Sequence, residues 1–193
     1  MTARERRRLL RALSKGDEGK RWKAATALVE LADPKALRAV EGILQNGRDE
    51  LSRGAAAYVL GFSGDSDSAP MLARVLADRN ESRVVRAYAA EALGHLLQHD
   101  SVLAEVRTAI QAGLRDPAAE IRFWSAFAAG VLGLQETRPY LLHLAASDEE
   151  TLPGWWSVAE EADWALRVLD GEEDPPLPGP IPVAPPGGAD AGS

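Results

Sequence analysis

The sequence contains no cysteine, which excludes disulfide bonds, thiolate metal sites and cysteine nucleophiles. Aromatic residues make up only 6 % of the chain, and there are three histidines. No apolar run approaches the length that spans a bilayer, and the basic N-terminus lacks the apolar region of a secretory signal. We therefore expect a cytoplasmic protein with no membrane association.

Most of the chain has the composition of a folded protein. Of 193 residues, 46 % are hydrophobic and 26 % are charged, which is ordinary for a soluble domain. Residues 172–193 differ, because they hold seven of the 12 prolines and nothing that could build a core. The composition predicts a folded region over residues 1–171 and a disordered, Pro/Gly-rich tail over residues 172–193.

Signatures of several enzyme classes are absent: there is no P-loop, no G-x-S-x-G and no H-E-x-x-H. His95 and His99 follow Glu91 at four-residue spacing, and such a set could ligate zinc or iron. Histidine is also favoured near a helix end by the helix dipole, and no second acid–histidine cluster accompanies this one. We expect no metal, no cofactor and no catalytic residue.

Four segments of the chain repeat one pattern. Each opens with an arginine and an alanine-rich stretch, at Arg21, Arg53, Arg86 and Arg122. The steps between these arginines are 32, 33 and 36 residues. Alanine stands four positions after each of these register arginines, and small or apolar residues stand seven and eight positions after. These positions share one helical face, so they allow a neighbouring helix to approach closely.

A second amphipathic segment follows each alanine-rich one, and no run alternates with the period of a strand. The predicted fold is therefore all-α. One helix pair cannot bury its own apolar face, so about four to five pairs are expected to stack into a solenoid. The predicted repeats are residues 17–48, 49–79, 80–115 and 116–148, with capping helices at 4–14 and 155–169.

The register arginines have a structural interpretation. Asp17 precedes Arg21 by four residues, and Asp49 precedes Arg53 by four. An aspartate at a helix start caps free N–H groups and can pair with an arginine one turn later. Stacked repeats would turn such pairs into a ladder of ion pairs.

The repeats resemble HEAT repeats, in particular the short HEAT-like repeats of phycobilisome lyases. The family pattern V-R-x-A-A-x-A-L-G, then a Gly-Asp-Pro-type turn and P-x-L-x-x-A-L, is carried best by VVRAYAAEALG (84–94) and LGFSGDSDSAPMLARVL (60–76). The fourth repeat departs from it, with Phe123, Trp124 and Phe127 where small residues are usual. The resemblance covers about residues 17–169 and implies an armadillo-like, right-handed α-α superhelix.

This resemblance also implies a function. In HEAT solenoids the second helices of successive pairs line the concave surface, where an extended partner lies. We therefore expect a monomeric, non-catalytic protein–protein interaction module or scaffold whose partner is another protein. Its candidate contact residues form a polar stripe on the second helices: Arg38, Glu41, Arg74, Gln111, Arg115 and His143.

Charge is unevenly distributed along this chain of net charge −7. Residues 1–23 carry nine basic and three acidic side chains, whereas residues 148–174 carry ten acidic side chains and one arginine. The basic first helix, including Arg6 and Arg7, is a further candidate for docking an acidic partner surface. The negative net charge argues against nucleic acid as a ligand.

Enzymes built from HEAT-like repeats supply the alternative functions. Deoxyhypusine hydroxylase carries His-Glu pairs directly after the repeat arginine, and here those slots hold Trp22-Lys23, Gly54-Ala55, Ala87-Tyr88 and Phe123-Trp124. The sequence therefore argues against iron-dependent hydroxylation. A phycobilin-lyase-like activity and a DNA-glycosylase-type activity stay open. Trp124 and the basic N-terminus favour the glycosylase, and the net charge disfavours it.

Overall fold

The computed structural model describes residues 1–97, 101–173 and 175–180. These residues form ten α-helices and two 3₁₀ turns, with one isolated bridge between Thr151 and Ser157 and no named strand. The all-α prediction is thus confirmed. The helices are α1 (Ala3–Lys15), α2 (Glu18–Leu31), α3 (Pro34–Asn46), α4 (Glu50–Ser63), α5 (Ala69–Ala77), α6 (Arg83–Leu96), α7 (Ala104–Gly113), α8 (Ala119–Val131), α9 (Arg138–Ser147) and α10 (Val158–Leu169).

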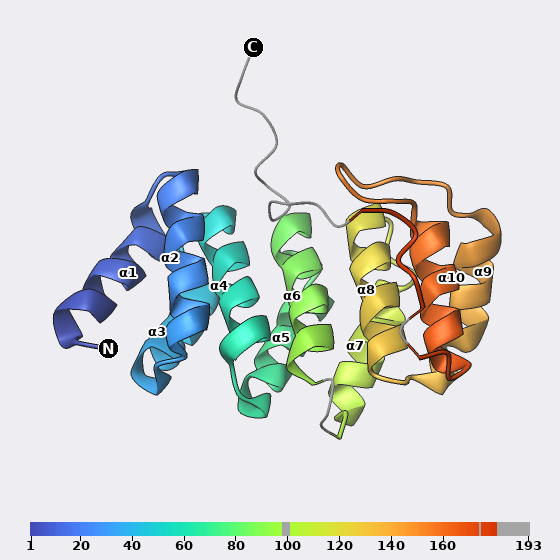
Figure 1. Cartoon of the computed structure of the whole chain (residues 1–193), viewed down its shortest axis with the longest axis horizontal. Coiled ribbons are helices and arrows are strands. Elements are labelled where there is room, and N and C mark those ends of the chain that lie inside the picture. Colours follow the sequence, from blue (N-terminus) through green and yellow to red (C-terminus); the bar gives the residue numbers. More distant parts are fainter. Residues whose placement is uncertain (98–100, 174, 181–193) are drawn as a thin grey trace, which may run out of the picture.

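The helices pack as five pairs, α1–α2, α3–α4, α5–α6, α7–α8 and α9–α10, stacked side by side (Figure 1). Each register arginine donates a hydrogen bond to a carbonyl at or just beyond the end of the preceding helix. Arg21, for example, donates to the Leu13 oxygen at 3.0 Å. The predicted repeats group the helices differently, because they join each arginine helix to the helix after it, and their boundaries stay a prediction. The expected caps α1 and α10 each belong to a complete pair.

The pairs stack into two layers (Figure 1). The alanine-rich helices α2, α4, α6, α8 and α10 form what we call the inner layer, and α1, α3, α5, α7 and α9 form the outer layer. Inner helices are in close contact: a Cβ built on Gly61 would lie 2.6 Å from the Ala92 Cα, and one on Gly130 would lie 2.9 Å from the Ala165 Cα. Outer helices α3 and α5, like α7 and α9, approach each other less closely.

This difference in spacing decides the curvature. Two layers that are joined pair by pair but spaced differently bend toward the closer-spaced layer, so the inner layer lies on the concave side. The expectation that the second helices of the predicted repeats line the concave surface is therefore corrected. Those helices are α3, α5, α7 and α9, and they belong to the outer layer.

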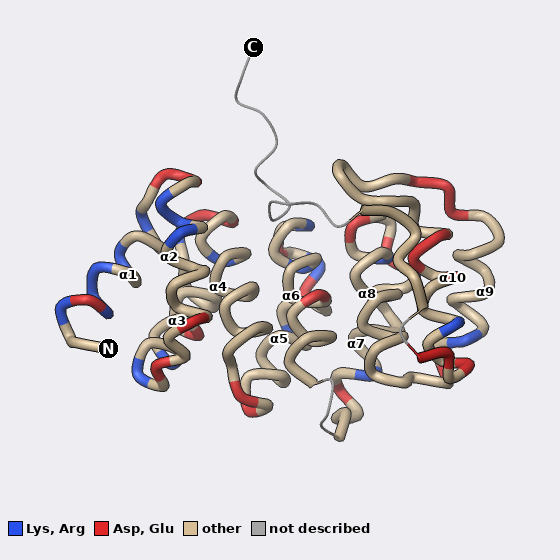
Figure 2. The backbone as a smooth tube through the Cα atoms, viewed as in Figure 1, with Lys and Arg blue, Asp and Glu red and all other residues tan. Residues whose placement is uncertain are grey.

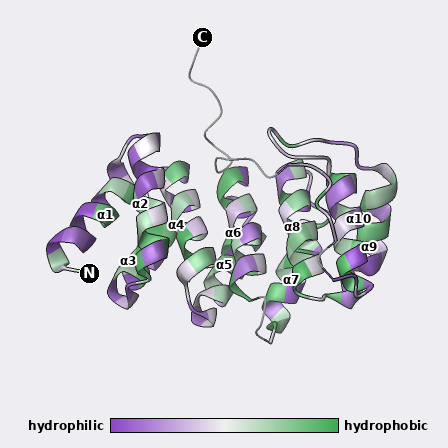
Figure 3. Cartoon of the chain, viewed as in Figure 1, coloured by the Kyte–Doolittle hydropathy of each residue, from purple (hydrophilic) through white to green (hydrophobic). Residues whose placement is uncertain are grey.

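The core lies between the two layers. Leu28, Leu60 and Leu93, seven residues after their register arginines, are each 1 % exposed or less. Outer helices contribute Val40 and Ile110, both fully buried. Figure 3 shows the resulting distribution, with hydrophobic stretches along α4 and a strongly hydrophilic α1. No helix in the described ranges is long and apolar enough to cross a membrane.

A ladder of four ion pairs ties successive helix pairs together. Each acid lies between the next outer helix and the next inner helix. The pairs are Arg21–Asp49, Arg53–Glu81, Arg86–Asp116 and Arg122–Asp148, with nitrogen–oxygen distances of 3.3, 2.7, 2.7 and 2.6 Å. The ladder therefore exists, but it joins different repeats. The expected pairing within a repeat is wrong, because Asp17 pairs instead with Lys20.

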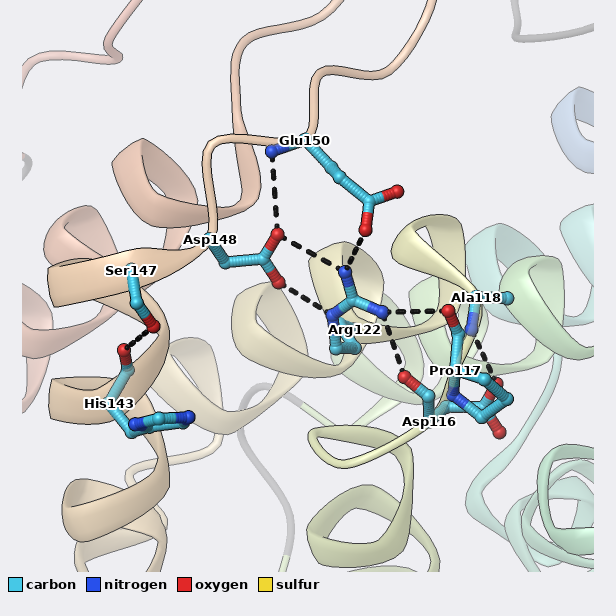
Figure 4. Close-up of polar contacts among 8 residues, drawn as sticks. All are labelled: Asp116, Pro117, Ala118, Arg122, His143, Ser147, Asp148 and Glu150. Carbon is cyan, nitrogen blue, oxygen red and sulfur yellow. Dashed lines mark hydrogen bonds and ion pairs between the residues drawn. The ribbon is translucent and has the colours of Figure 1, made fainter.

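Arg122 illustrates one rung of this ladder (Figure 4). Its guanidinium makes two hydrogen bonds to the Asp148 carboxylate, at 2.6 and 3.1 Å, and a third to Glu150 at 2.9 Å. Its remaining nitrogen donates to the Asp116 and Pro117 carbonyl oxygens, both at 2.9 Å. The hydrogen bond to Asp148 raises the pKa of Arg122 above its ordinary value. One side chain thus ties the loop before α8 to the segment after α9.

The chain after α10 turns back and packs on that helix. The Trp164 indole donates a hydrogen bond to the Pro175 carbonyl oxygen at 3.0 Å, and Pro175 is buried. This contact corrects the expectation that nothing from residue 172 onward packs on the solenoid. Residues 174 and 181–193 of the predicted tail lie outside the described residues.

Two glycine-to-alanine substitutions test the close approach of the inner helices. Gly61→Ala places a methyl group against the α6 backbone and should destabilise the fold by about 1–3 kcal/mol. Gly42→Ala, on outer helix α3 with nothing within 4 Å of the added Cβ, should instead stabilise it by up to about 1 kcal/mol. Thermal and urea unfolding would measure both. Equal effects of the two substitutions would contradict the two-layer account.

Candidate functional site: an aromatic strip on the inner layer

Aromatic side chains are concentrated on one side of the molecule. Of the 5 tryptophans, 3 tyrosines and 3 phenylalanines, only Tyr140 belongs to an outer helix. The others stand on inner helices or in the segment that precedes α10. Seven rings from all five inner helices form what we call the aromatic strip: Trp22, Tyr58, Phe62, Tyr88, His95, Phe127 and Trp164.

The rings of the strip touch in an unbroken series. Trp22 of α2 meets Tyr58 of α4 edge to face at 5.3 Å between ring centroids. Phe62, one turn after Tyr58, lies 4.2 Å from His95 of α6. The His95 ring is 4.9 Å from Phe127 of α8. The series ends where Phe127 stacks on Trp164 of α10 at 6.1 Å and 18°. These are the spacings at which aromatic pairs attract.

The strip is accessible to solvent along much of its length. Phe62 is 42 % exposed, and Trp22, Tyr58, Phe127 and Trp164 are half-buried. A continuous row of accessible rings costs solubility and is typical of a surface that binds something. The half-buried rings also pack against the core, so part of each ring contacts the interior and part stays accessible.

A carboxyl group stands at the centre of the strip. Glu91 lies five residues after its register arginine, the position that holds Tyr58 in the repeat before it and Phe127 in the repeat after it. It is 7 % exposed, and its Oε2 atom has no hydrogen-bond partner among the described residues. Tyr88 precedes it by three residues and His95 follows by four, so both share its helical face.

Burial controls the charge of these groups. Removal from water raises the pKa of Glu91 to about 8, so the carboxyl carries a proton at neutral pH. Burial also lowers the pKa of His95 to about 4, which keeps its ring neutral. The pKa values of Tyr58 and Tyr88 are raised, first by burial and then by the nearby Glu91. The strip is therefore uncharged at its centre, with a proton held at Glu91.

A second group of rings packs beside the C-terminal end of the strip. Trp124 lies 5.8 Å from Phe127 and 5.1 Å from Trp155. Trp156 packs on Phe123 at 5.9 Å and donates a hydrogen bond to Glu161 at 2.6 Å. Trp124, which suggested a base-holding aromatic for DNA, is only 6 % exposed. It serves as packing for α8 rather than as an exposed platform.

The predicted polar stripe lies on the opposite layer. Arg38, Arg74 and His143 are exposed on α3, α5 and α9, and in Figure 4 His143 lies apart from the Arg122 network. The rest of the stripe is partly engaged within the chain. Glu41 accepts a hydrogen bond from Ser68 at 2.9 Å. Arg115 lies 4.9 Å over the Tyr140 ring and donates weakly to the Gln111 carbonyl. A binding role for these residues stays a prediction.

The basic first helix is partly neutralised. Arg6 lies 3.6 Å from Asp33, which caps α3, while Arg7 is exposed. Figure 2 shows basic residues gathered on α1 and the start of α2, with acidic residues in the segment after α9 and around the end of α10. The two ends of the solenoid thus differ in charge, and docking by Arg6 and Arg7 stays a prediction.

The suggested metal ligands are not brought together in the described part of the chain. His99 lies outside the described residues, and His95 packs between Phe62 and Phe127. Within residues 1–97, 101–173 and 175–180, no group of three His, Asp or Glu side chains is arranged to hold a metal ion.

Comparison with known proteins identifies the repeats. Residues 6–94 match the family model for HEAT repeats. The CpcE–CpcF complex of phycocyanin lyase from Nostoc sp. PCC7120 superimposes with a TM-score of 0.67 at 20 % identity, covering 86 % of this chain and 99 % of that one. Residues 6–94 are therefore HEAT repeats, and the chain has the fold of a HEAT-like solenoid, as predicted from its repeats.

Relatives of this chain include a second enzyme. Deoxyhypusine hydroxylase of Saccharomyces cerevisiae is 42 % identical over 71 residues, which is 35 % of this chain. The match spans 22 % of the yeast enzyme, so this chain corresponds to about a fifth of that relative. The human deoxyhypusine hydroxylase structure, in complex with glycerol, superimposes with a TM-score of 0.44 at 18 % identity, covering 86 % of this chain and 85 % of that one.

These relatives correct one expectation. The sequence was interpreted as that of a non-enzyme, because it lacks known catalytic signatures. Both named relatives are enzymes, one matched in sequence and one in fold. The absence of familiar motifs is therefore no ground for excluding catalysis by this chain.

Glu91→Gln tests the buried proton. The folded-state pKa of Glu91 is raised from 4.5 to about 8, so between these pH values the folded state binds a proton that the unfolded state has lost. Stability from this group is thus full below about pH 4.5 and falls as pH rises toward 8, by at most about 1.4 kcal/mol per pH unit. The melting temperature of the wild type should therefore drop relative to Glu91→Gln between about pH 5 and pH 8.

Glu105→Gln, on the exposed side of α7, controls for the loss of one acidic side chain. A melting-temperature difference between the wild type and Glu91→Gln that stays constant with pH would show that Glu91 is not held protonated.

Proposed function

We propose that this chain is a binding subunit that works together with a second protein, and that the aromatic strip is its binding face. The observation that carries the proposal is the unbroken series of accessible rings across all five inner helices. Such a surface suits an extended, largely apolar segment of a partner. Rigid aromatic side chains offer a large contact area at little cost in conformational entropy.

The partner is proposed to be a protein for two reasons. The strip runs lengthwise along the solenoid, from α2 to α10, which suits an extended chain better than a compact ligand. The structural neighbour belongs to a complex of two proteins, CpcE and CpcF, and the superposition covers 86 % of this chain and 99 % of the neighbour's chain. The charged ends of the solenoid, with Arg7 exposed at one of them, would add steering to such an encounter.

Phe62→Ser tests the proposal, because Phe62 is the most accessible ring of the strip. The tagged wild-type chain would first be used to identify a partner by mass spectrometry, and binding would then be measured with purified proteins. Removing a central ring should weaken binding by about 10-fold or more. Leu142→Ser is the matched control, since Leu142 is 53 % exposed on outer helix α9.

Both variants should keep the wild-type melting temperature within a few degrees, because neither side chain is buried. Equal binding by the wild type and Phe62→Ser, with weaker binding by Leu142→Ser or Arg74→Ala, would contradict the proposal and would indicate that the partner binds the outer layer.

A second candidate function is a lyase-like activity on a flat conjugated ligand. The observation that favours it is Glu91, a protonated carboxyl with an unpartnered oxygen, set among the rings of the strip. Such a group can donate a proton to a ligand stacked on those rings. The likeness in fold to phycocyanin lyase supports a conjugated ligand of the phycobilin type.

Absorbance titration tests this second function. A phycobilin added to the wild-type chain should show a shifted and saturable absorption band, and Glu91→Gln should lose the shift while keeping the fold. A spectrum that equals the sum of the separate components, in both proteins, would remove this candidate.

A further inference from the structure

The first rung of the arginine ladder differs from the other three. Its ion pair, Arg21–Asp49, has a nitrogen–oxygen distance of 3.3 Å, whereas the later pairs lie at 2.7, 2.7 and 2.6 Å. Within the described residues Arg21 donates a hydrogen bond only to the Leu13 carbonyl oxygen, whereas each later arginine also donates to its acid. The Asp49 side chain is 47 % exposed, and the acids of the later rungs are 16 % exposed or less.

Burial makes this incomplete pairing important. The Arg21 side chain is only 7 % exposed, so little of it is in contact with water. Its Nη1 nitrogen makes no hydrogen bond within the part of the chain that the structure describes. Asp49 is also engaged elsewhere, because its Oδ1 atom accepts a hydrogen bond from the Ser52 amide at 2.8 Å and so caps α4. A buried guanidinium with an unused donor favours the binding of a further anion.

Arg21 lines a pocket of about 460 Å³ between the C-terminal ends of α1 and α3 and the loop before α4. The end of α1 contributes Ser14 and Lys15, and the loop contributes Arg48 and Asp49. The charged side chains of the lining are thus three basic and one acidic, which leaves a surplus of two positive charges. The pocket lies in the N-terminal part of the molecule, where basic residues gather (Figure 2).

This set of side chains suits a phosphate group. Guanidinium groups bind phosphate oxygens through paired N–H donors, and a lysine adds a compact positive charge. A phosphate monoester carries a charge of about −1.5 to −2 at pH 7, which matches the surplus in the pocket. A single carboxylate would neutralise only one of the two charges.

We propose that this pocket binds a phosphate group, either as free phosphate or as the phosphate of a small molecule. Buried Arg21 holds the ligand from one side, and the exposed Lys15 and Arg48 hold it from the solvent side. None of these residues is a ring of the aromatic strip, so the inference is independent of the proposed function. Because the ligand adds contacts that only the folded chain can make, it stabilises the first two helix pairs.

The test titrates the full-length chain with inorganic phosphate or with glycerol 3-phosphate, at ionic strength matched with sodium chloride. Backbone amide NMR shifts at Lys15, Gly47 and Arg48 would report binding. Both probes should give saturable shifts that weaken as salt is added. Tighter binding of glycerol 3-phosphate would identify a phosphorylated small molecule as the ligand, and binding no tighter than that of phosphate would identify the free ion.

Asp49→Asn is the most informative variant, because it is expected to bind phosphate more tightly. Asparagine keeps the side-chain oxygen that caps α4, and it caps helices about as well as aspartate. It removes the negative charge that competes with the ligand for Arg21. Phosphate affinity should therefore rise several-fold, a gain that misfolding cannot produce.

Arg48→Ala should weaken phosphate binding by about two- to fivefold, the range of a partly exposed ion pair. Arg79→Ala is the matched control, since Arg79 is an exposed arginine in the corresponding loop between α5 and α6. It should leave the affinity unchanged.

The absence of saturable shifts with both probes would overturn the proposal. Equal phosphate affinity of the wild type and Asp49→Asn would also overturn it, as would equal losses in Arg48→Ala and Arg79→Ala, which would indicate general attraction of anions to basic side chains. Because no protein partner takes part, each of these results would leave the proposed binding face untouched.

Discussion

The fold depends on the close approach of the inner helices. Glycine and alanine at Gly61, Ala92, Gly130 and Ala165 leave no space for larger side chains where these helices meet. This contact draws the inner layer together more tightly than the outer one and so decides which face is concave. It also brings rings from five helices within contact distance of one another, although contacting rings on neighbouring helices lie far apart in the sequence. The candidate site is therefore a consequence of the packing of small residues.

The register arginines add order to this packing. Each arginine donates a hydrogen bond to a carbonyl at the end of the preceding helix and forms an ion pair with an acid of the next helix pair. These two contacts determine the position of one helix pair relative to the next. Arg86 and Asp116 form the most buried of these ion pairs, and removing either side chain would leave an unpaired charge in the interior at a cost of about 3–5 kcal/mol. The interior thus holds a few costly charge pairs that specify geometry, while the concave face at Glu91 and His95 is kept neutral by burial.

Much of the fold could be predicted from the sequence, because helix periodicity places the alanine, leucine and glycine of each repeat on one face. The partner of each arginine could not, since an acid 26–30 residues away comes close only when repeats stack. The aromatic strip was missed for a related reason. Trp22, Tyr58, Phe62 and Tyr88 stand one, five, nine and two residues after their arginines, so no position of the repeat is aromatic in all four copies. The recognisable signals were the spacing of Tyr58 and Phe62 by four and the shared helical face of Tyr88 and His95.

The central claim is that partners bind the inner face and not the outer one. Site-specific photo-crosslinking tests it most directly, with benzoyl-phenylalanine placed at Phe62 on the inner layer or at Arg74 on the outer layer, both in exposed positions. The account predicts a covalent adduct with one defined partner from position 62 and none from position 74. An adduct from position 74 alone would contradict it and would return the binding role to the polar stripe of the outer helices.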